Sequence, residues 1–177
     1  PLLSVVMATY ETPAPYLLAA IQSVQAQIYD NWELCIADDA SSSPHVARIL
    51  RQVAADDLRI RVTVRPERGH IAAASNSALA LAHGVWGVLM DHDDVSPRDT
   101  LYEIAAEAIA HTTARIIYTD EDKIDGQGVQ YSPSFKPDFD PDLLLWQYLL
   151  NHLTAYRRDL IQSVGGFREG FPGAQDH

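Results

Sequence analysis

The stretch Val85-Trp86-Gly87-Val88-Leu89-Met90-Asp91-His92-Asp93-Asp94 gives the strongest indication of the fold. Its first six residues are mostly apolar, which is typical of a buried strand, and three of its last four are carboxylic acids. Carboxylates that converge in a cleft repel one another and lose solvation, and a hard divalent cation would relieve that repulsion. The stretch therefore predicts either a metal site at a strand end or a solvated acidic loop. On an extended segment Asp91 and Asp93 share a face, so both could reach one ion.

Apolar strands and amphipathic helices alternate on both sides of this stretch. The sequence predicts strands at residues 2–8, 32–37, 60–64, 85–90 and 116–119. It predicts helices at residues 12–28, 43–55, 71–82 and 96–108, three of them starting with Thr-Pro or Ser-Pro, a helix-capping pattern. Strands that alternate with helices indicate an α/β fold, with a mainly parallel, Rossmann-like sheet and helices on both faces.

The rhythm changes after residue 119. Residues 120–141 are polar and rich in glycine and proline, which predicts a hairpin or a long loop. A short helix at 142–150, a strand at 153–156 and a helix at 158–164 follow, and Gly165-Gly166 ends the last helix. We expect residues 1–177 to form a single domain. The chain begins at Pro1 and stops at Asp176-His177, so we also expect a C-terminally truncated piece of a longer protein.

Composition restricts the classes of partner. The chain has 177 residues, a hydrophobic fraction of 47% and a net charge of -11. This charge argues against binding nucleic acid or an anionic membrane through overall electrostatics, although a metal could still mediate contact with a phosphorylated ligand. The one cysteine, Cys35, lies in an apolar strand and is expected in the core. There is no signal peptide and no apolar stretch of about 18 residues.

Polar residues follow three of the predicted strands: Thr9-Tyr10-Glu11, Asp38-Asp39 and the acidic stretch Asp91–Asp94. Open parallel sheets bind ligands outside the carboxyl ends of their strands, so these clusters predict one site. The glycine-rich dinucleotide fingerprint and the phosphate loop are both missing. Asp39 is suited to a nucleobase because a carboxylate accepts hydrogen bonds from N–H groups, and Tyr10 could stack on that base or simply pack at a strand end.

Several motifs, in their order and spacing, resemble the GT-A fold glycosyltransferases of family 2. The motifs are Ser4–Tyr10, Trp32–Ser41, Ala73–Asn76, Leu89–Asp94 and Val164–Phe167. Tyr118–Asp125 and Phe135–Asp138 resemble a bacterial subgroup that builds cell-surface polysaccharides such as O-antigens. The resemblance covers essentially the whole chain.

The resemblance implies a nucleotide-diphosphate sugar as donor, with a UDP-sugar favoured. Together with the strand-end positions, it places the nucleotide-binding residues at Thr9, Tyr10, Glu11, Asp39, His70 and Asp91. It implies that Asp91 and Asp93 hold Mn²⁺ or Mg²⁺ against the diphosphate and that Asp94 extends the motif. His152 could face the metal or pack. Residues 1–95 would then be the nucleotide-sugar half and residues 96–177 the acceptor-side half, the latter expected to be incomplete.

The resemblance also implies the chemistry. Asp176 occupies the position of the general base, although the family usually has Glu-Asp where this chain has Gln175-Asp176. A carboxylate there gives a single displacement with inversion. The acceptor would be a saccharide or a lipid-linked sugar, and acidic residues 120–122 could contact it or form a solvated loop. The setting would be cytoplasmic, with peripheral association at the inner face of the membrane as a further expectation.

Three other functions can be weighed against the sequence. A sugar-nucleotide nucleotidyltransferase would carry a basic, glycine-rich loop after the first strand, where this chain has Thr9–Pro13. An aspartate-nucleophile phosphatase would place its acidic motif after the first strand. A non-catalytic metal- or sugar-binding module would ignore UDP in the presence of manganese, whereas a transferase would not.

Overall fold

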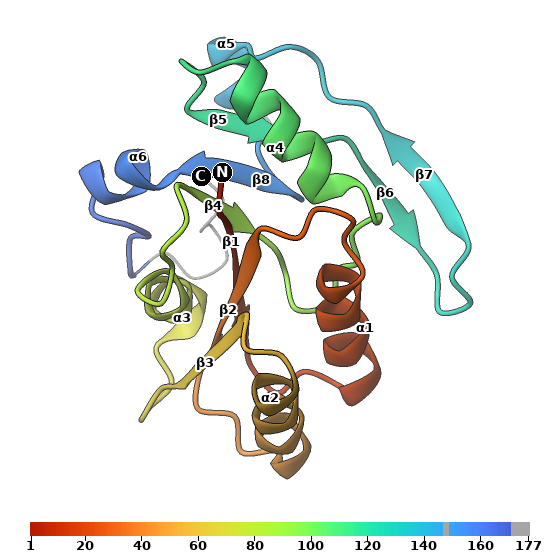
Figure 1. Cartoon of the computed structure of the whole chain (residues 1–177), viewed down its shortest axis with the longest axis vertical. Helices are drawn as coiled ribbons and strands as arrows, with labels where there is room; N and C mark the ends of the chain where they lie inside the picture. Colours follow the sequence, from red (N-terminus) through yellow and green to blue (C-terminus); the bar gives the residue numbers. More distant parts are fainter. Residues whose placement is uncertain (147–148, 171–177) are drawn as a thin grey trace.

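A computed structural model of the chain describes residues 1–146 and 149–170. Within these residues, six strands form the main sheet (Figure 1). They are β1 (Leu3–Thr9), β2 (Trp32–Asp38), β3 (Ile60–Val64), β4 (Trp86–Leu89), β5 (Ile116–Tyr118) and β8 (Thr154–Arg157). The helices are α1 (Ala14–Gln25), α2 (Pro44–Asp56), α3 (His70–Leu79), α4 (Thr100–Ala110), α5 (Pro141–Leu144) and α6 (Arg158–Ser163). The predicted α/β class is confirmed.

The sheet has the strand order β3-β2-β1-β4-β8-β5. Strands β1 to β4 pair in parallel, with Val5 opposite Leu34 on one side and Val88 on the other. Strand β8 is antiparallel to both β4 and β5. The sheet is therefore mainly parallel, as predicted. The carboxyl ends of β1, β2 and β4 meet at one edge because these strands are neighbours that run the same way.

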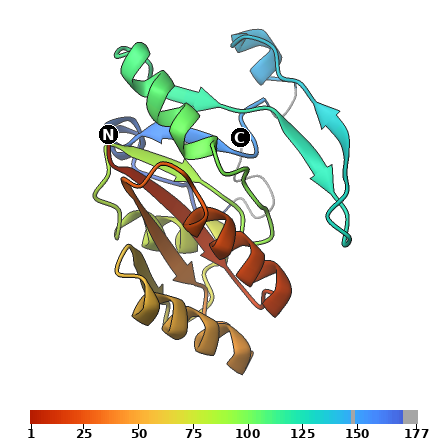
Figure 2. The same cartoon turned by 45° about the vertical axis from the view of Figure 1, so that its right-hand side comes forward.

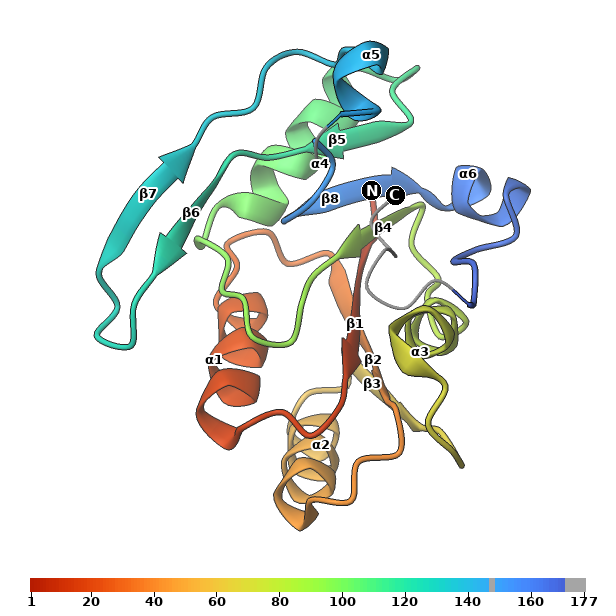
Figure 3. The ribbon, with the colours of Figure 1, turned by 180° about the vertical axis from the view of Figure 1, so that it is seen from behind.

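Helices cover both faces of the sheet (Figures 1 and 3). The side chains of β1 alternate between the two faces, as successive side chains of a strand do. Leu3, Val5 and Met7 belong to the large core, to which α1, α2 and α4 contribute their buried aliphatic side chains. Val6 packs on the opposite face against the alanines of α3. The small side chains of α3 let this helix lie close to the sheet. The predicted core position of Cys35 is confirmed, since its side chain is fully buried.

Residues 120–141 contain a two-stranded hairpin formed by β6 (Glu121–Ile124) and β7 (Gln130–Ser134). The hairpin projects away from the main sheet (Figure 2), and every residue of β7 is exposed. The sequence left a hairpin and a long loop open for this segment, and the structure has the hairpin. None of the helices in the described ranges is both long and apolar enough to span a bilayer.

Helix α2 starts with Ser43-Pro44 as predicted, whereas α1 and α4 start later than predicted. Two of the expected capping hydroxyls, those of Thr12 and Ser43, bind other side chains. The hydroxyl of Thr12 lies 2.6 Å from that of Thr9 instead of capping α1. Ser43 occupies the N-cap of α2, but its hydroxyl donates to Glu11. Helix α4 begins at Thr100 rather than near residue 97.

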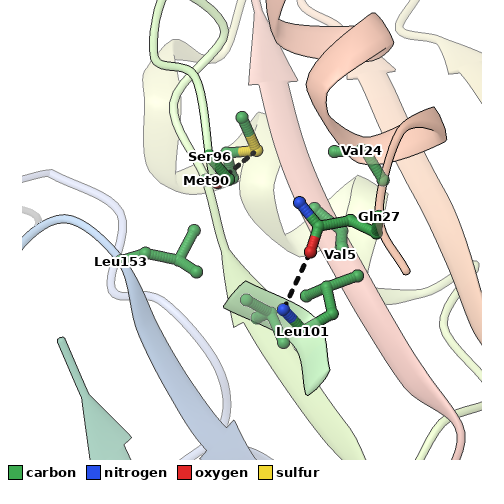
Figure 4. A pocket seen from close by; sticks show the side chains of 8 residues that line it. Val5, Val24, Gln27, Met90, Ser96, Leu101 and Leu153 are labelled. Carbon is green, nitrogen blue, oxygen red and sulfur yellow. Dashed lines mark hydrogen bonds between the residues drawn. The ribbon is translucent and has the colours of Figure 1, made fainter. Parts of the chain in front are cut away.

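The late start of α4 follows from the side chain of Gln27. Its Oε1 accepts from the backbone N–H of Leu101 at 2.9 Å, and its Nε2 donates to the carbonyl of Pro97 at 2.6 Å. The buried Gln27 thereby holds the segment before α4 against the end of α1 (Figure 4). It lines a small, almost wholly apolar pocket with room for no more than about one water molecule. This pocket is part of the core and is no ligand site.

Candidate nucleotide and metal site

The three polar clusters predicted from the strand ends lie at one edge of the sheet. Thr9 and Asp38 are register partners at the ends of β1 and β2, and the backbone N–H of Asp39 donates to the carbonyl of Thr9 at 2.9 Å. Strand β4 lies on the other side of β1, so the acidic stretch follows at the same edge. The sequence placed these clusters together correctly, because neighbouring parallel strands end on the same side.

Asp39 is held in a buried ion pair. Its side chain is about 3% exposed, and its Oδ1 lies 2.9 Å from Nε of Arg65. The same oxygen accepts from the backbone N–H of Gly69 at 2.9 Å. Arg65 is itself fixed by donating to the carbonyl of Ala73 and to the hydroxyl of Ser77. Both contacts use Oδ1, and Oδ2 is the second acceptor atom of this carboxylate.

Tyr10 directly follows Thr9, the last residue of β1, and is 37% exposed. The guanidinium carbon of Arg68 lies 4.2 Å from the centre of the Tyr10 ring, which is a cation–π distance. Arg65 and Arg68 both follow β3, so the loop after this strand supplies two cations to the same edge. A base that stacks on Tyr10 would share the ring with Arg68 or use its other face.

Glu11 binds the loop after β2. Its carboxylate accepts from the backbone N–H of Ser42 at 2.5 Å and from the hydroxyls of Ser42 and Ser43. The hydrogen bonds from Ser43 and Ser42 lower the pKa of Glu11 to about 2. The predicted nucleotide residue Glu11 is therefore ionised and engaged with the serines of this loop.

Three residues of this edge have left-handed backbone conformations, which non-glycine residues adopt infrequently. Their φ angles are 51° at Glu11, 60° at Ala40 and 62° at His70. Each lies directly after β1, after β2 or at the first turn of α3. Such conformations persist where the surrounding structure enforces them, and they gather at ligand sites. His70 thus stands at the predicted edge, at the start of α3.

The acidic stretch is a turn and not the extended segment that the sequence suggested. The backbone N–H of Asp94 lies 3.4 Å from the carbonyl of Asp91. A turn of this kind brings the first and fourth side chains together, so Asp91 and Asp94 converge while Asp93 is exposed. The expected shared face of Asp91 and Asp93 is therefore wrong in its geometry. The role of Asp93 at a metal stays a prediction.

His152 completes the acidic group. Its Nδ1 lies 2.9 Å from Oδ2 of Asp94 and 3.5 Å from Oδ2 of Asp91. The hydrogen bond to Asp94 raises the pKa of His152 to about 9, against the opposing effect of burial, and the charges of Asp94, Asp91 and Glu121 raise it further. The imidazole therefore faces the acidic residues, and its role at a metal stays a prediction.

This group could hold a divalent cation. One ligand atom from each of Asp91, Asp94 and His152 lies within 4.8 Å of the others. The carboxylates suit Mn²⁺ or Mg²⁺, and the imidazole, once neutral, adds a nitrogen ligand. Mg²⁺ keeps mostly oxygen ligands and near-ideal octahedral geometry, so this donor set fits Mn²⁺ better. The histidine proton and a metal ion would compete for the same place.

The sequence analysis assigned no role at the site to Arg65, Arg68 or Lys136, although Lys136 lies within the subgroup motif Phe135–Asp138. Arg65 and Arg68 could have been found, because they follow a strand that ends at the same edge. Lys136 lies in a segment far from the acidic turn in sequence, and no spacing pattern predicts its contacts. The predicted base, Asp176, lies outside the described residues.

Comparison with known proteins is consistent with this arrangement. Residues 4–165 match the family described as Glycosyl transferase family 2. The O-antigen biosynthesis protein RfbC of Myxococcus xanthus is 41% identical over 178 aligned residues, which cover 100% of this chain and 14% of RfbC. The chain therefore belongs to glycosyl transferase family 2, and it spans only a small part of this curated relative.

Solved structures show the same fold. The S. aureus TarS structure in complex with UDP-GlcNAc has a TM-score of 0.79 at 22% identity, covering 98% of this chain and 50% of that one. The mannosyltransferase PcManGT from Pyrobaculum calidifontis, in complex with GDP-Man and Mn²⁺, has a TM-score of 0.75 at 25% identity. The matched region covers 99% of this chain and 50% of the PcManGT chain. The fold is thus the GT-A fold expected from the sequence.

Proposed function

We propose that this domain binds a nucleotide-diphosphate sugar and transfers its sugar, with inversion, to a saccharide or lipid-linked acceptor. The observation that carries the proposal is the placement of two chemically different groups on one sheet edge. Asp39, a buried carboxylate paired with Arg65, lies directly after β2. The group of Asp91, Asp94 and His152 lies beyond β4, two strands away. The carboxylate of Asp39 suits a nucleobase, and the acidic group suits a cation that would bind the diphosphate.

The residues of the nucleotide-sugar half, 1–95, would orient the donor. Oδ2 of Asp39 would accept the N–H of a base such as uracil, and a hydrogen bond to an ionised acceptor discriminates strongly against a base that lacks the donor. Tyr10 would offer its ring face to the base, beside Arg68. The acidic turn would face the diphosphate. Thr9 is buried and hydrogen-bonded to Thr12, so it would shape the pocket from behind.

Asp91, Asp94 and His152 would hold Mn²⁺, with Asp93 as a further ligand that could turn inward. When bound, the ion would supply Lewis-acid stabilisation of the charge that develops on the departing nucleoside diphosphate. His152 would have to release its proton to solvent before its nitrogen could serve as a ligand, and Asp94, which now binds the imidazole, would then be available to the ion.

Residues 96–177 would form the acceptor side. We propose Asp176 as the general base that removes the proton of the acceptor hydroxyl, which must lie within hydrogen-bond reach of its carboxylate. Attack from the face opposite the leaving group inverts the anomeric centre. The cellular role would be synthesis of a cell-surface polysaccharide in the cytoplasm, with peripheral association of the whole protein at the membrane.

A nucleotidyltransferase is the rival within the enzymes. It would need cations after β1 to hold a triphosphate, and this chain places Glu11 there, bound to the serines that follow β2. A non-catalytic module is the rival of another class. Either rival would lack metal-dependent binding of a sugar-linked diphosphate followed by transfer.

The test is a thermal-stability screen with nucleotides and nucleotide sugars, with Mn²⁺, with Mg²⁺ and with EDTA. A ligand that binds the folded state raises the melting temperature. We expect UDP or a UDP-sugar to raise it in Mn²⁺ and much less in EDTA. The proposed function would be contradicted if no nucleoside diphosphate raised the melting temperature with either metal. A shift from nucleoside triphosphates alone would favour the nucleotidyltransferase.

A further inference from the structure

The ammonium group of Lys136 lies in a buried place between the hairpin and the acidic group. Its side chain is 6% exposed. Nζ donates to the carbonyl of Asn151 at 2.5 Å and to the carbonyl of His152 at 3.0 Å, and it lies 3.1 Å from Oε2 of Glu121. Two backbone carbonyls accept hydrogen bonds from the ammonium, and the carboxylate of Glu121 balances its charge as an ion-pair partner. Lys136 is thus tied to two segments at once.

The backbone and the side chain of Lys136 both contact residues outside their own segment. Its backbone N–H donates to Oδ1 of Asp120 at 2.8 Å, directly before β6. Its partner Glu121 is the first residue of β6. The carbonyls that Lys136 binds belong to Asn151 and His152, just before β8. The side chain therefore links the base of the hairpin to the segment that carries the histidine of the acidic group.

The imidazole and the carbonyl of His152 are bound to different partners. The carbonyl accepts from Lys136, and the imidazole lies against Asp94 and Asp91. A buried ammonium is costly unless it is paired, so the lysine strongly favours the one backbone position in which both carbonyls point at it. That position is the one from which the imidazole reaches the acidic turn.

We propose that Lys136 is a positioning residue, which holds His152 against Asp91 and Asp94 and thereby couples the hairpin to the metal-binding part of the donor site. This inference rests on the proposed function only in naming the acidic group as a metal site. Groups behind a metal ligand that orient it affect metal affinity by about 10- to 100-fold.

The electrostatic effect of Lys136 has the opposite sign to its positioning effect. If the ammonium acted only as a charge, its removal would raise Mn²⁺ affinity, because a nearby cation repels the metal. If it positions His152, its removal lowers Mn²⁺ affinity. The sign of the change therefore separates the two roles.

The experiment compares the parent protein with Lys136→Met, His152→Ala and the double variant. The chain's other lysine, the exposed Lys123, gives the matched control Lys123→Met. Mn²⁺ affinity is measured by titration calorimetry without nucleotide. We expect Lys136→Met to weaken Mn²⁺ binding about tenfold, Lys123→Met to leave it unchanged, and Lys136→Met to have no further effect once His152 is Ala.

A second measurement uses the metal-free protein. Urea unfolding of the same four proteins gives the coupling between positions 136 and 152. We expect the double variant to lose less stability than the sum of the two single losses. Lys136→Met could fold poorly because Glu121 loses its partner. In that case the combined variant Lys136→Gln/Glu121→Gln, which removes both charges of the pair, is used in place of Lys136→Met.

Each outcome decides one question. Unchanged or tighter Mn²⁺ binding by the Lys136 variants overturns the positioning role, and so does an equal effect of Lys136→Met with and without His152. If the parent does not bind Mn²⁺, the metal part of the proposed function fails, and the metal-free coupling alone decides the role of Lys136. Additive stability losses would then overturn it.

Discussion

Nδ1 of His152 lies 2.9 Å from Oδ2 of Asp94, at the point where two carboxylates of the acidic turn converge. Asp91 lies 3.5 Å from the same nitrogen. A protonated imidazole placed between two carboxylates neutralises part of the repulsion that a metal ion would otherwise relieve. The metal-free protein thus uses a proton where the donor-bound protein would use a cation.

This ion pair predicts how stability depends on pH. The pKa of His152 is raised from 6.5 to about 9, so the folded protein holds this proton more tightly than the unfolded chain. The contribution to stability is full below about pH 6.5 and is lost as the pH rises through about 9. We expect the difference in free energy of unfolding between the parent and His152→Asn to shrink from pH 6 to pH 9.5, as measured by urea denaturation in EDTA.

The control for this prediction is His111→Asn. His111 lies 3.4 Å from Glu107, with both side chains more than half exposed, and such pairs contribute little. Its replacement should change the free energy of unfolding only slightly at any of these pH values. A His152→Asn difference that stays constant from pH 6 to 9.5 would show that the imidazole is not charged in the folded protein.

The turn geometry predicts which aspartates matter most for the metal. Asp91 and Asp94 converge with His152, and Asp93 is exposed outside this group. Replacing Asp91 or Asp94 with Asn removes a charged ligand, so we expect Mn²⁺ affinity to fall by at least about tenfold. Asp93→Asn should lower it less. Titration calorimetry with Mn²⁺ alone measures all three on the same scale.

The outcome that contradicts the turn geometry is a larger loss from Asp93→Asn than from Asp94→Asn. That ranking would mean that the segment rearranges into an extended form in which residues 91 and 93 share a face. Melting temperatures of the three variants serve as the control. Asp94→Asn also removes the ion pair with His152 and should lower the melting temperature somewhat, but these side chains are at least partly exposed, so we expect none of the variants to unfold the domain.

The sequence was sufficient to predict which residues lie at this edge of the sheet, but it was not sufficient to predict which side chains pair with one another there. Neighbouring parallel strands must end on the same side, so Thr9, Asp39 and the acidic turn could be placed together from strand order alone. The pairing of Asp94 with His152 joins residues 58 positions apart. It depends on β8 returning antiparallel beside β4, which no local pattern encodes. The prediction that Asp91 and Asp93 share a face assumed the alternating side chains of an extended strand, and it was wrong because the chain turns at these residues.

The base pocket gives a prediction that is independent of metal. Asp39→Asn keeps an oxygen for the N–H of Gly69 but loses the charged acceptor and the partner of Arg65. We expect nucleoside affinity, measured in EDTA, to fall by about 1–3 kcal/mol. The melting temperature should also fall, since the partly buried Arg65 loses its carboxylate partner.

The neighbouring Asp38→Asn is the matched control for Asp39. Asp38 is equally buried at the end of β2, but its carboxylate binds the backbone and hydroxyl of Ser41. It should destabilise the loop after β2 while changing nucleoside affinity less than Asp39→Asn does. Equal losses of nucleoside affinity in both variants would reduce Asp39 to a structural residue of the strand end.

The last prediction separates donor binding from transfer. If Asp176 is the general base, Asp176→Asn removes proton abstraction and leaves the donor site intact. We expect the transfer rate to fall by about 10²- to 10⁴-fold, with the affinity for UDP in Mn²⁺ unchanged. Glu169→Gln, which removes an exposed acidic side chain seven positions earlier, should leave both quantities unchanged. The anomeric configuration of the product, read by NMR from the parent reaction, should be inverted relative to the donor. Full transfer by the Asn variant, or a retained configuration, would remove Asp176 from the mechanism, whereas loss of UDP binding would place it in the donor site instead.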